Sequence, residues 1–214
     1  MYLTHLQLPL AHRAVQKLIS NPYSMHQFLM SGLPFPAGRA LYRIEPLSND
    51  AKSAIVLVQT QQEPKWLVER IPPNSKVATK AVGAAFETLC NGQRLRFRLR
   101  ANPTKKQKCE GKDQGRRVAL VHEEDQLKWL ARKGETCGFE LAENSESKTP
   151  ACVIRDDKEL IAHKPGGAPP LTYRSVLFEG TLKIRDVKAF RNTLFAGMGS
   201  GKAFGFGLLS VARI

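Results

Sequence analysis

RLRFRLRANP, at residues 94–103, alternates apolar and charged side chains. In an extended chain Leu95, Phe97 and Leu99 point to one side, and the arginines between them point to the other. The stretch therefore predicts a half-buried β-strand. One face of this strand belongs to a hydrophobic core, and the opposite face carries a row of guanidinium groups.

The segments that follow this strand predict further strands and helices. The polar residues 104–117 predict a loop, and RVALV and GFEL predict short strands. Acidic residues open EEDQLKWLARKG, at residues 123–134, and its glycine ends the stretch, which is typical of a helix. The last predicted elements are a turn-rich connector at 163–170, a strand at 172–184, a helix that Asp186 caps, and a terminal strand at 203–212.

The segments that precede the strand give the same order of elements. A strand at 1–10 is followed by a helical pattern at 11–20 and by a helix through Met30 that has Asn21 as its N-cap and Pro22 at its first position. Strands are then predicted at 40–47, 53–61 and 76–82, with one helical turn at most before the prolines at 72 and 73.

Both halves of the chain thus predict a β-α-β-β-α-β order, which is the order of the ferredoxin-like fold. We expect an α+β protein with two tandem ferredoxin-like (RRM-like) domains and a C-terminal glycine-rich loop. The predicted boundaries are 1–90 for the N-terminal domain and 91–214 for the C-terminal domain.

Composition points to a globular protein with an anionic partner. The 214 residues are 42% hydrophobic, and the formal charge of +14 exceeds what solubility requires. Nucleic acid is the commonest polyanionic partner. A membrane surface is the competing interpretation, but no signal peptide, long apolar run or basic amphipathic helix supports it. We therefore expect a soluble cytoplasmic protein.

No pattern in the sequence predicts a metal or a cofactor. Four widely spaced cysteines lack C-x-x-C pairs and histidines at zinc-ligand spacing, so we expect free thiols. No D-x-D or paired-carboxylate arrangement suggests a two-metal nuclease. We expect no metal and no cofactor.

Residues 94–117 form a basic region with ten lysines and arginines and two acids. Such a region can neutralise phosphates, although a solvated face of a basic protein is the alternative. Aromatic residues make up only 7% of the chain, and neither aromatic motif of RNA-recognition domains is present. Base stacking on an open sheet is therefore not expected.

Five glycines lie in the C-terminal stretch GMGSGKAFGFG, at residues 197–207. A dinucleotide-binding loop follows a strand, whereas this stretch follows a predicted helix, and Ala203 stands where a P-loop has serine or threonine. Closely spaced glycines expose backbone amides, which suit an anion. We interpret the stretch as a cradle for an RNA phosphate, with Lys202 contributing charge.

Tyr23 and His26 are three residues apart on the helix that Asn21 caps, so both side chains lie on one helical face. Histidine can move a proton near neutral pH, and a phenol can orient or protonate a neighbouring oxygen. A structural histidine is the alternative, because the pair alone is a weak signal.

These features together resemble the CRISPR-associated endoribonucleases of the CasE type, which process CRISPR precursor RNA in the subtype I-E Cascade complex. The resemblance spans almost the whole chain. It rests on MYLTHLQL, NPYSMHQFL, LYRIEP, VLVQTQ, RLRFRLRANPTK, WLARKGETCGFEL, SVLFEGTLKI and GMGSGKAFGFGLLSVA.

The resemblance implies two ferredoxin-like domains and metal-independent cleavage at the base of the repeat hairpin. The products would carry a 2′,3′-cyclic phosphate and a 5′-hydroxyl, and the crRNA would be retained beside other Cascade subunits. The family's catalytic tyrosine and histidine match Tyr23 and His26. A basic residue found after the histidine in some relatives has no counterpart in QFLMSGL.

The expected RNA contacts combine the basic region with the glycine-rich loop. They are Arg96, Arg98, Arg100, Asn102, Lys105, Arg116, Arg117, Gly197, Gly199, Gly201 and Lys202. Two alternatives remain open. A non-catalytic RNA-hairpin-binding subunit would share the basic surface but would not need His26, and an architectural RNA-binding protein would not need Tyr23 and His26 on one face.

Overall fold

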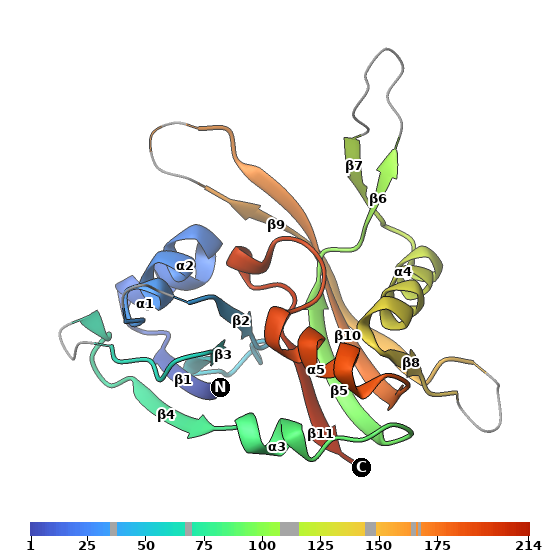
Figure 1. Ribbon diagram of the computed structural model, residues 1–214. Helices are drawn as coiled ribbons and strands as arrows, with labels where there is room; N and C mark the ends of the chain where they lie inside the picture. The colour runs from blue at the N-terminus through green and yellow to red at the C-terminus, as the bar shows by residue number, and fades with distance from the viewer. Residues whose placement is uncertain (35–37, 67–69, 108–115, 144–148, 164–165, 167) are drawn as a thin grey trace. The chain divides into compact units, whose positions relative to one another are not determined.

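The computed structural model describes residues 1–34, 38–66, 70–107, 116–143, 149–163, 166 and 168–214. Its described residues divide into two compact units (Figure 1). The first unit comprises Met1–Leu89, Ile161–Thr172 and Gly201–Leu208, and the second comprises Cys90–Leu160, Tyr173–Ser200 and Leu209–Ile214. The predicted boundary near residue 90 remains a proposal, and this division differs from it by placing two later segments with the first unit.

The first unit is a four-stranded antiparallel sheet in the order β2-β3-β1-β4. Its elements are β1 (Tyr2–Pro9), α1 (Arg13–Ser20), α2 (Pro22–Met30), β2 (Ala40–Ile44), β3 (Ser53–Thr60), β4 (Lys76–Ala81), the short α3 (Gly83–Glu87) and the 3-10 helix η2 (Lys202–Phe204). The order of strands is that of a ferredoxin-like fold. Between β3 and β4 the described residues contain no α-helix, in line with the single turn expected there.

Alternating apolar residues of β1 and β3 build the core of the first unit. Leu6 and Leu8 of β1 are fully buried, and so are Val56 and Val58 of β3. The helices α1 and α2 cover this face of the sheet, and Met25 belongs to the same core. The core therefore anchors α2 by its apolar side.

The second unit has a sheet in the order β11-β5-β10-β8, with β9 paired to β10. Its elements are β5 (Arg94–Ala101), β6 (Thr104–Gln107), β7 (Arg116–Ala119), α4 (Glu123–Cys137), β8 (Phe139–Leu141), β9 (Cys152–Ala162), β10 (Leu171–Ile184), α5 (Val187–Ala196) and β11 (Leu209–Arg213). When the inserted strands β6, β7 and β9 are left out, the order of the four remaining strands is again that of a ferredoxin-like fold. The α+β class with two ferredoxin-like units is confirmed.

The alternation that predicted β5 is confirmed by its burial. Leu95, Phe97 and Leu99 are at most 4% exposed and face the core of the second unit. Two aromatic pairs extend this core: Trp129 stacks on Phe178 with centroids 6.3 Å apart, and Phe139 meets Phe190 edge to face. The helix α4 is held on the sheet through Trp129.

Four elements differ from the sequence prediction. The helix α4 continues through Gly134, which is buried against Phe139, and ends at Gly138, whose φ of 80° forms the cap. The terminal strand begins only at Leu209, because glycines with positive φ and η2 occupy 201–207. The strand β6 lies where a loop was expected, and β9 was not predicted.

The hairpin of β6 and β7 projects beyond the main sheet of the second unit, next to α4 (Figure 1). Its strands pair only with each other in the described part of the chain. No helix among the described residues is long and apolar enough to span a membrane.

Candidate catalytic helix and nucleic-acid interface

The helix α2 carries Tyr23 and His26 on the flank of its buried stripe. Pro22, Met25 and Leu29 are buried, whereas Tyr23 and His26 are half-buried. Each of these two residues follows a buried residue by about 100° around the helix. Packing of the apolar stripe therefore fixes the direction in which Tyr23 and His26 project.

Asn21 holds the beginning of α2 in two ways. Its Oδ1 accepts a hydrogen bond from the backbone N–H of Tyr23 at 3.1 Å, which confirms the predicted N-cap. The same side chain pairs with the backbone of His163: Nδ2 donates to its carbonyl at 3.0 Å, and Oδ1 accepts from its N–H at 3.3 Å. Asn21 thus ties the start of α2 to the connector between β9 and β10.

The imidazole of His26 lies in a partly apolar environment. Its Nδ1 is shielded from solvent and has no hydrogen-bond partner among the described residues. Burial lowers the pKa of His26 below the ordinary value of 6.5. A neutral imidazole is therefore favoured at neutral pH, and Nε2 is the ring nitrogen left to reach a substrate.

Tyr42 of β2 connects α2 to the segment after η2. Its buried phenol donates a hydrogen bond to the carbonyl of Pro22 at 3.1 Å. On the same ring, Cε2 lies 3.1 Å from the point where a Cβ on Gly205 would be placed. Gly205 has φ +89°, so both its backbone conformation and the available space favour glycine.

The helices α2 and η2 pack against each other in the first unit. This packing places the segment that begins with Lys202 beside the helix that carries Tyr23 and His26. Arg43 strengthens the arrangement, because its buried guanidinium donates to the carbonyl of Leu208 at 3.3 Å and pairs with Glu45 at 2.7 Å. Contacts between residues distant in the sequence thus bring η2, which begins with Lys202, next to α2, which carries His26.

The glycine-rich loop has the backbone that its composition predicts. All five of its glycines adopt positive φ: Gly197, Gly199, Gly201, Gly205 and Gly207. Gly197 ends α5, and Gly199 lies against the indole of Trp129. The positive φ angles alone are enough to account for glycine at these five positions. The binding of an RNA phosphate by this loop therefore remains a proposal.

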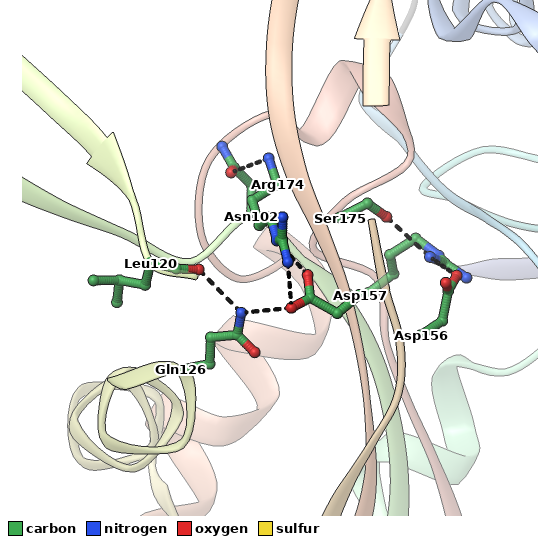
Figure 2. Close-up of polar contacts among 8 residues, drawn as sticks. Asn102, Leu120, Gln126, Asp156, Asp157, Arg174 and Ser175 are labelled. Atoms are coloured by element: carbon green, nitrogen blue, oxygen red, sulfur yellow. Dashed lines mark hydrogen bonds and ion pairs between the residues drawn. The ribbon is translucent and has the colours of Figure 1, made fainter. Parts of the chain in front are cut away.

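The arginine row of β5 is partly neutralised within the second unit. Arg100 is only 7% exposed, and its Nη1 lies 2.8 Å from Asp156 of β9 and 2.9 Å from the hydroxyl of Ser175 (Figure 2). Arg98 forms an ion pair with Glu179 at 2.6 Å. Arg100 is therefore held by an internal ion pair and hydrogen bond, and its RNA contact stays a prediction.

Asn102 also makes internal hydrogen bonds. It is 7% exposed, accepts from the backbone N–H of Arg174 at 3.1 Å and donates to Ser200 at 3.4 Å. Figure 2 shows the neighbouring network, in which Asp157 bonds both Arg174 and Gln126. Asn102 therefore joins the end of β5 to β10 and to the glycine-rich loop, and this positions the loop.

The remaining predicted RNA contacts lie on exposed strands. Lys105, Arg116 and Arg117 are exposed on the β6–β7 hairpin, and Arg96 is exposed on β5, where its guanidinium donates to the carbonyl of Arg213. Lys108 and Lys112 of the basic region lie outside the described residues. RNA contacts of these side chains stay predictions.

Sequence reasoning missed Tyr42 and Arg43 as supports of the site. Both lie in LYRIEP, a stretch that predicts only a strand. Their partners, Pro22 and Leu208, are distant along the chain, and only the fold brings them together. Within the described ranges, no three histidine, cysteine or acidic side chains gather closely enough to hold a metal ion.

Comparison with known proteins assigns the chain to a family. Residues 1–213 match the family described as CRISPR associated protein. The chain is 39% identical to the CRISPR-associated endoribonuclease Cse3 of Thermus thermophilus over 219 residues, which cover 99% of this chain and 100% of the relative. It is 31% identical to the CRISPR system Cascade subunit CasE of Escherichia coli, covering 90% of this chain and 92% of the relative.

A solved structure agrees with the sequence matches. Thermus thermophilus Cse3 bound to an RNA representing a pre-cleavage complex superposes with a TM-score of 0.85 at 39% identity. The match covers 99% of this chain and 98% of that chain. The protein therefore belongs to the CRISPR-associated protein family, and it is a Cse3/CasE-type member of that family.

Proposed function

We propose that this protein is a CRISPR endoribonuclease that binds the repeat hairpin of precursor crRNA and cleaves it without a metal ion. The family relatives named above, an endoribonuclease and a Cascade subunit, support this function. The observation that carries the proposed mechanism is the placement of Tyr23 and His26 on the flank of α2, beside η2 and Lys202.

In this mechanism the neutral imidazole of His26 removes the proton from the ribose 2′-hydroxyl next to the scissile phosphate. The 2′-oxygen attacks phosphorus, and the bond from phosphorus to the 5′-oxygen breaks as that oxygen receives a proton. The products are a 2′,3′-cyclic phosphate and a 5′-hydroxyl. The lowered pKa of His26 supports the role of base, because the unprotonated form dominates at neutral pH.

Tyr23 and Lys202 would act on the same phosphate group. The phenol of Tyr23, on the same face of α2 as His26, would orient the 2′-hydroxyl or share the proton transfer. The ammonium of Lys202 and the backbone amide of Gly201 would stabilise negative charge that develops on the phosphate oxygens. Asn21 and Tyr42 would keep α2 in position.

After cleavage the protein would retain the crRNA as part of a Cascade complex. An assembly of this kind supports a cytoplasmic location, where precursor RNA is made. RNA binding would use the exposed cations of the β6–β7 hairpin and of β5, whose charge suits phosphates.

The test is cleavage of a labelled repeat hairpin in EDTA by the wild type, by His26→Ala and by His122→Ala, with analysis of the product ends. His122 is an exposed histidine whose side chain makes no cap hydrogen bond, so it is a matched control. We expect cyclic-phosphate products from the wild type and from His122→Ala only. Binding without cleavage by the wild type would identify a non-catalytic RNA-binding subunit instead.

A further inference from the structure

The side chain of Asn21 makes more contacts than a helix cap needs. Its Oδ1 accepts a hydrogen bond from the backbone N–H of Tyr23 at 3.1 Å, and this bond alone caps α2. The same Oδ1 accepts from the N–H of His163 at 3.3 Å, and Nδ2 donates to the carbonyl of His163 at 3.0 Å. The two bonds to His163 therefore have a purpose other than capping.

The two bonds to His163 match the chemistry of an amide side chain. Such a side chain carries an acceptor oxygen beside a donor nitrogen. His163 presents its backbone N–H and its carbonyl to these two atoms of Asn21. Residues on neighbouring antiparallel strands exchange the same pair of bonds. The amide of Asn21 thus takes the place of a strand partner just beyond the end of β9.

The contact reaches a well-supported point of the first unit. His163 directly follows β9, which pairs with β10. Ala162, the last residue of β9, is fully buried. Asn21 and the segment Ile161–Thr172 both belong to the first unit. We call the two bonds between Asn21 and His163 the amide tether, and this tether joins α2 to strand backbone and not to a side chain.

The amide tether acts at the end of α2 that carries the proposed catalytic pair. Tyr23 and His26 lie in the first two turns after Asn21. The buried Met25 and Leu29 hold the apolar side of this helix on the core. The amide tether holds the first turn from a different element. Catalysis depends on close alignment of the reacting groups, so a small shift of this turn affects the rate of the chemical step.

We propose that Asn21 is a positioning residue for RNA cleavage, because its amide tether to the backbone of His163 holds Tyr23 and His26 in place. The inference rests on the proposed function, and it goes beyond helix capping by adding the end of β9 to the support of the site. Neither Asn21 nor His163 has to touch the RNA for this role. Loss of the tether therefore slows cleavage of bound RNA and leaves the affinity for RNA unchanged.

Two substitutions remove the tether and keep the cap. Serine and aspartate cap helices about as well as asparagine does, so Asn21→Ser and Asn21→Asp retain an acceptor for the N–H of Tyr23. Serine has no amide group. Aspartate has the shape of asparagine, but it presents an oxygen in place of the Nδ2 donor to the carbonyl of His163. Asn21→Ala removes both the tether and the cap.

Gln16→Ala is the matched control for the loss of one contact between a side chain and the backbone. Gln16 is an exposed residue of the neighbouring helix α1, and its Nε2 donates to the carbonyl of Leu10 at 2.9 Å. Its removal costs a hydrogen bond of the same kind, in the same unit, without a change in α2.

The experiment measures single-turnover cleavage of a labelled repeat hairpin in EDTA at saturating protein. Dissociation constants are measured with a hairpin that carries a 2′-deoxy nucleotide at the cleavage position. We expect the rate constants of Asn21→Ser and Asn21→Asp to fall about tenfold. The dissociation constant of Asn21→Ser should equal that of the wild type, and Gln16→Ala should match the wild type in both measurements. Asn21→Ala should lose at least as much rate as Asn21→Ser.

Two further readouts separate positioning from a folding defect. A folding defect lowers the amount of deoxy hairpin that the protein binds at saturation, whereas a positioning defect lowers the rate constant of the protein that does bind. Amide hydrogen exchange reports the two contacts directly. In Asn21→Ser the amide of His163 should exchange faster than in the wild type, and the amide of Tyr23 should keep its protection.

Wild-type rate constants for Asn21→Ser and Asn21→Asp would overturn the inference and leave Asn21 as a helix cap only. An equal loss of rate in Gln16→Ala would also overturn it, because the effect would then follow from any lost hydrogen bond. Failure of the wild type to cut the all-ribose hairpin in EDTA would instead overturn the proposed function, and the positioning role with it.

Discussion

The phenol oxygen of Tyr42 donates a hydrogen bond to the carbonyl of Pro22, 3.1 Å away, and so joins β2 to the first residue of α2. The same ring lies against Gly205. One buried side chain therefore supports both the helix that carries Tyr23 and His26 and the segment that follows Lys202. We regard Tyr42 as a positioning residue for the proposed site.

Tyr42→Phe should lower the free energy of unfolding by about 1 kcal/mol, because the Pro22 carbonyl loses its donor. Single-turnover cleavage should become slower while the dissociation constant for the hairpin stays the same. Tyr2→Phe is the control, since the Tyr2 hydroxyl has no hydrogen-bond partner among the described residues. Weaker RNA binding with an unchanged cleavage rate would contradict this role.

Gly205→Ala should destabilise the protein more than Gly92→Ala does. Both glycines have positive φ, at +89° and +81°, so the backbone cost is similar. A Cβ at position 205 would meet the ring of Tyr42 at 3.1 Å, whereas a Cβ at 92 would meet nothing within 4 Å. Chemical denaturation of the two variants measures the difference, and equal losses of stability would show that the contact with Tyr42 carries no cost.

Arg100→Ala should lower stability by about 2 kcal/mol, because it leaves Asp156 and Ser175 without their buried partner. Lys105→Ala removes an exposed cation of the β6–β7 hairpin and should weaken RNA binding without a change in thermal stability. Unfolding curves and hairpin affinities for the two variants check this contrast. A stable Arg100→Ala variant with poor RNA affinity would show that Arg100 contacts RNA after all.

Cleavage should persist to a pH below the ordinary pKa of histidine. Burial lowers the pKa of His26 from 6.5, so the neutral base remains dominant as the pH falls through that value. The rate should decline only when the lower, folded-state pKa is reached. The unfolded chain binds a proton at His26 more readily, so acidification through this range also favours unfolding. Single-turnover rates between neutral and acidic pH give the profile, and an acidic limb at or above 6.5 would contradict it.

Much of the fold follows from local sequence signals. The caps Asn21 and Asp186 mark the starts of α2 and α5, and the alternation around Leu95 marks β5. The pattern does not predict β9 because five successive charged residues, 155–159, fill the middle of this strand, so the apolar alternation of a half-buried strand is absent there. A glycine after an apolar stripe predicts the end of a helix at Gly134, but α4 continues past it because Phe139 packs too closely there for any larger residue.

The candidate site was predictable only in part. The spacing of Tyr23 and His26 on one capped helix is a local signal. The acids that pair with Arg98 and Arg100 lie on β9 and β10, far along the chain, so the sequence alone did not reveal that these arginines are neutralised.

The central claim is that His26 activates a ribose hydroxyl of the RNA itself. Its most direct test compares, in EDTA, an all-ribose repeat hairpin with one that carries a single 2′-deoxy nucleotide at the cleavage position. We predict that the protein binds both hairpins equally, cuts the first to a 2′,3′-cyclic phosphate and leaves the second intact. Cleavage of the deoxy-substituted hairpin at the same bond would contradict the account, because that bond has no adjacent 2′-hydroxyl to attack it.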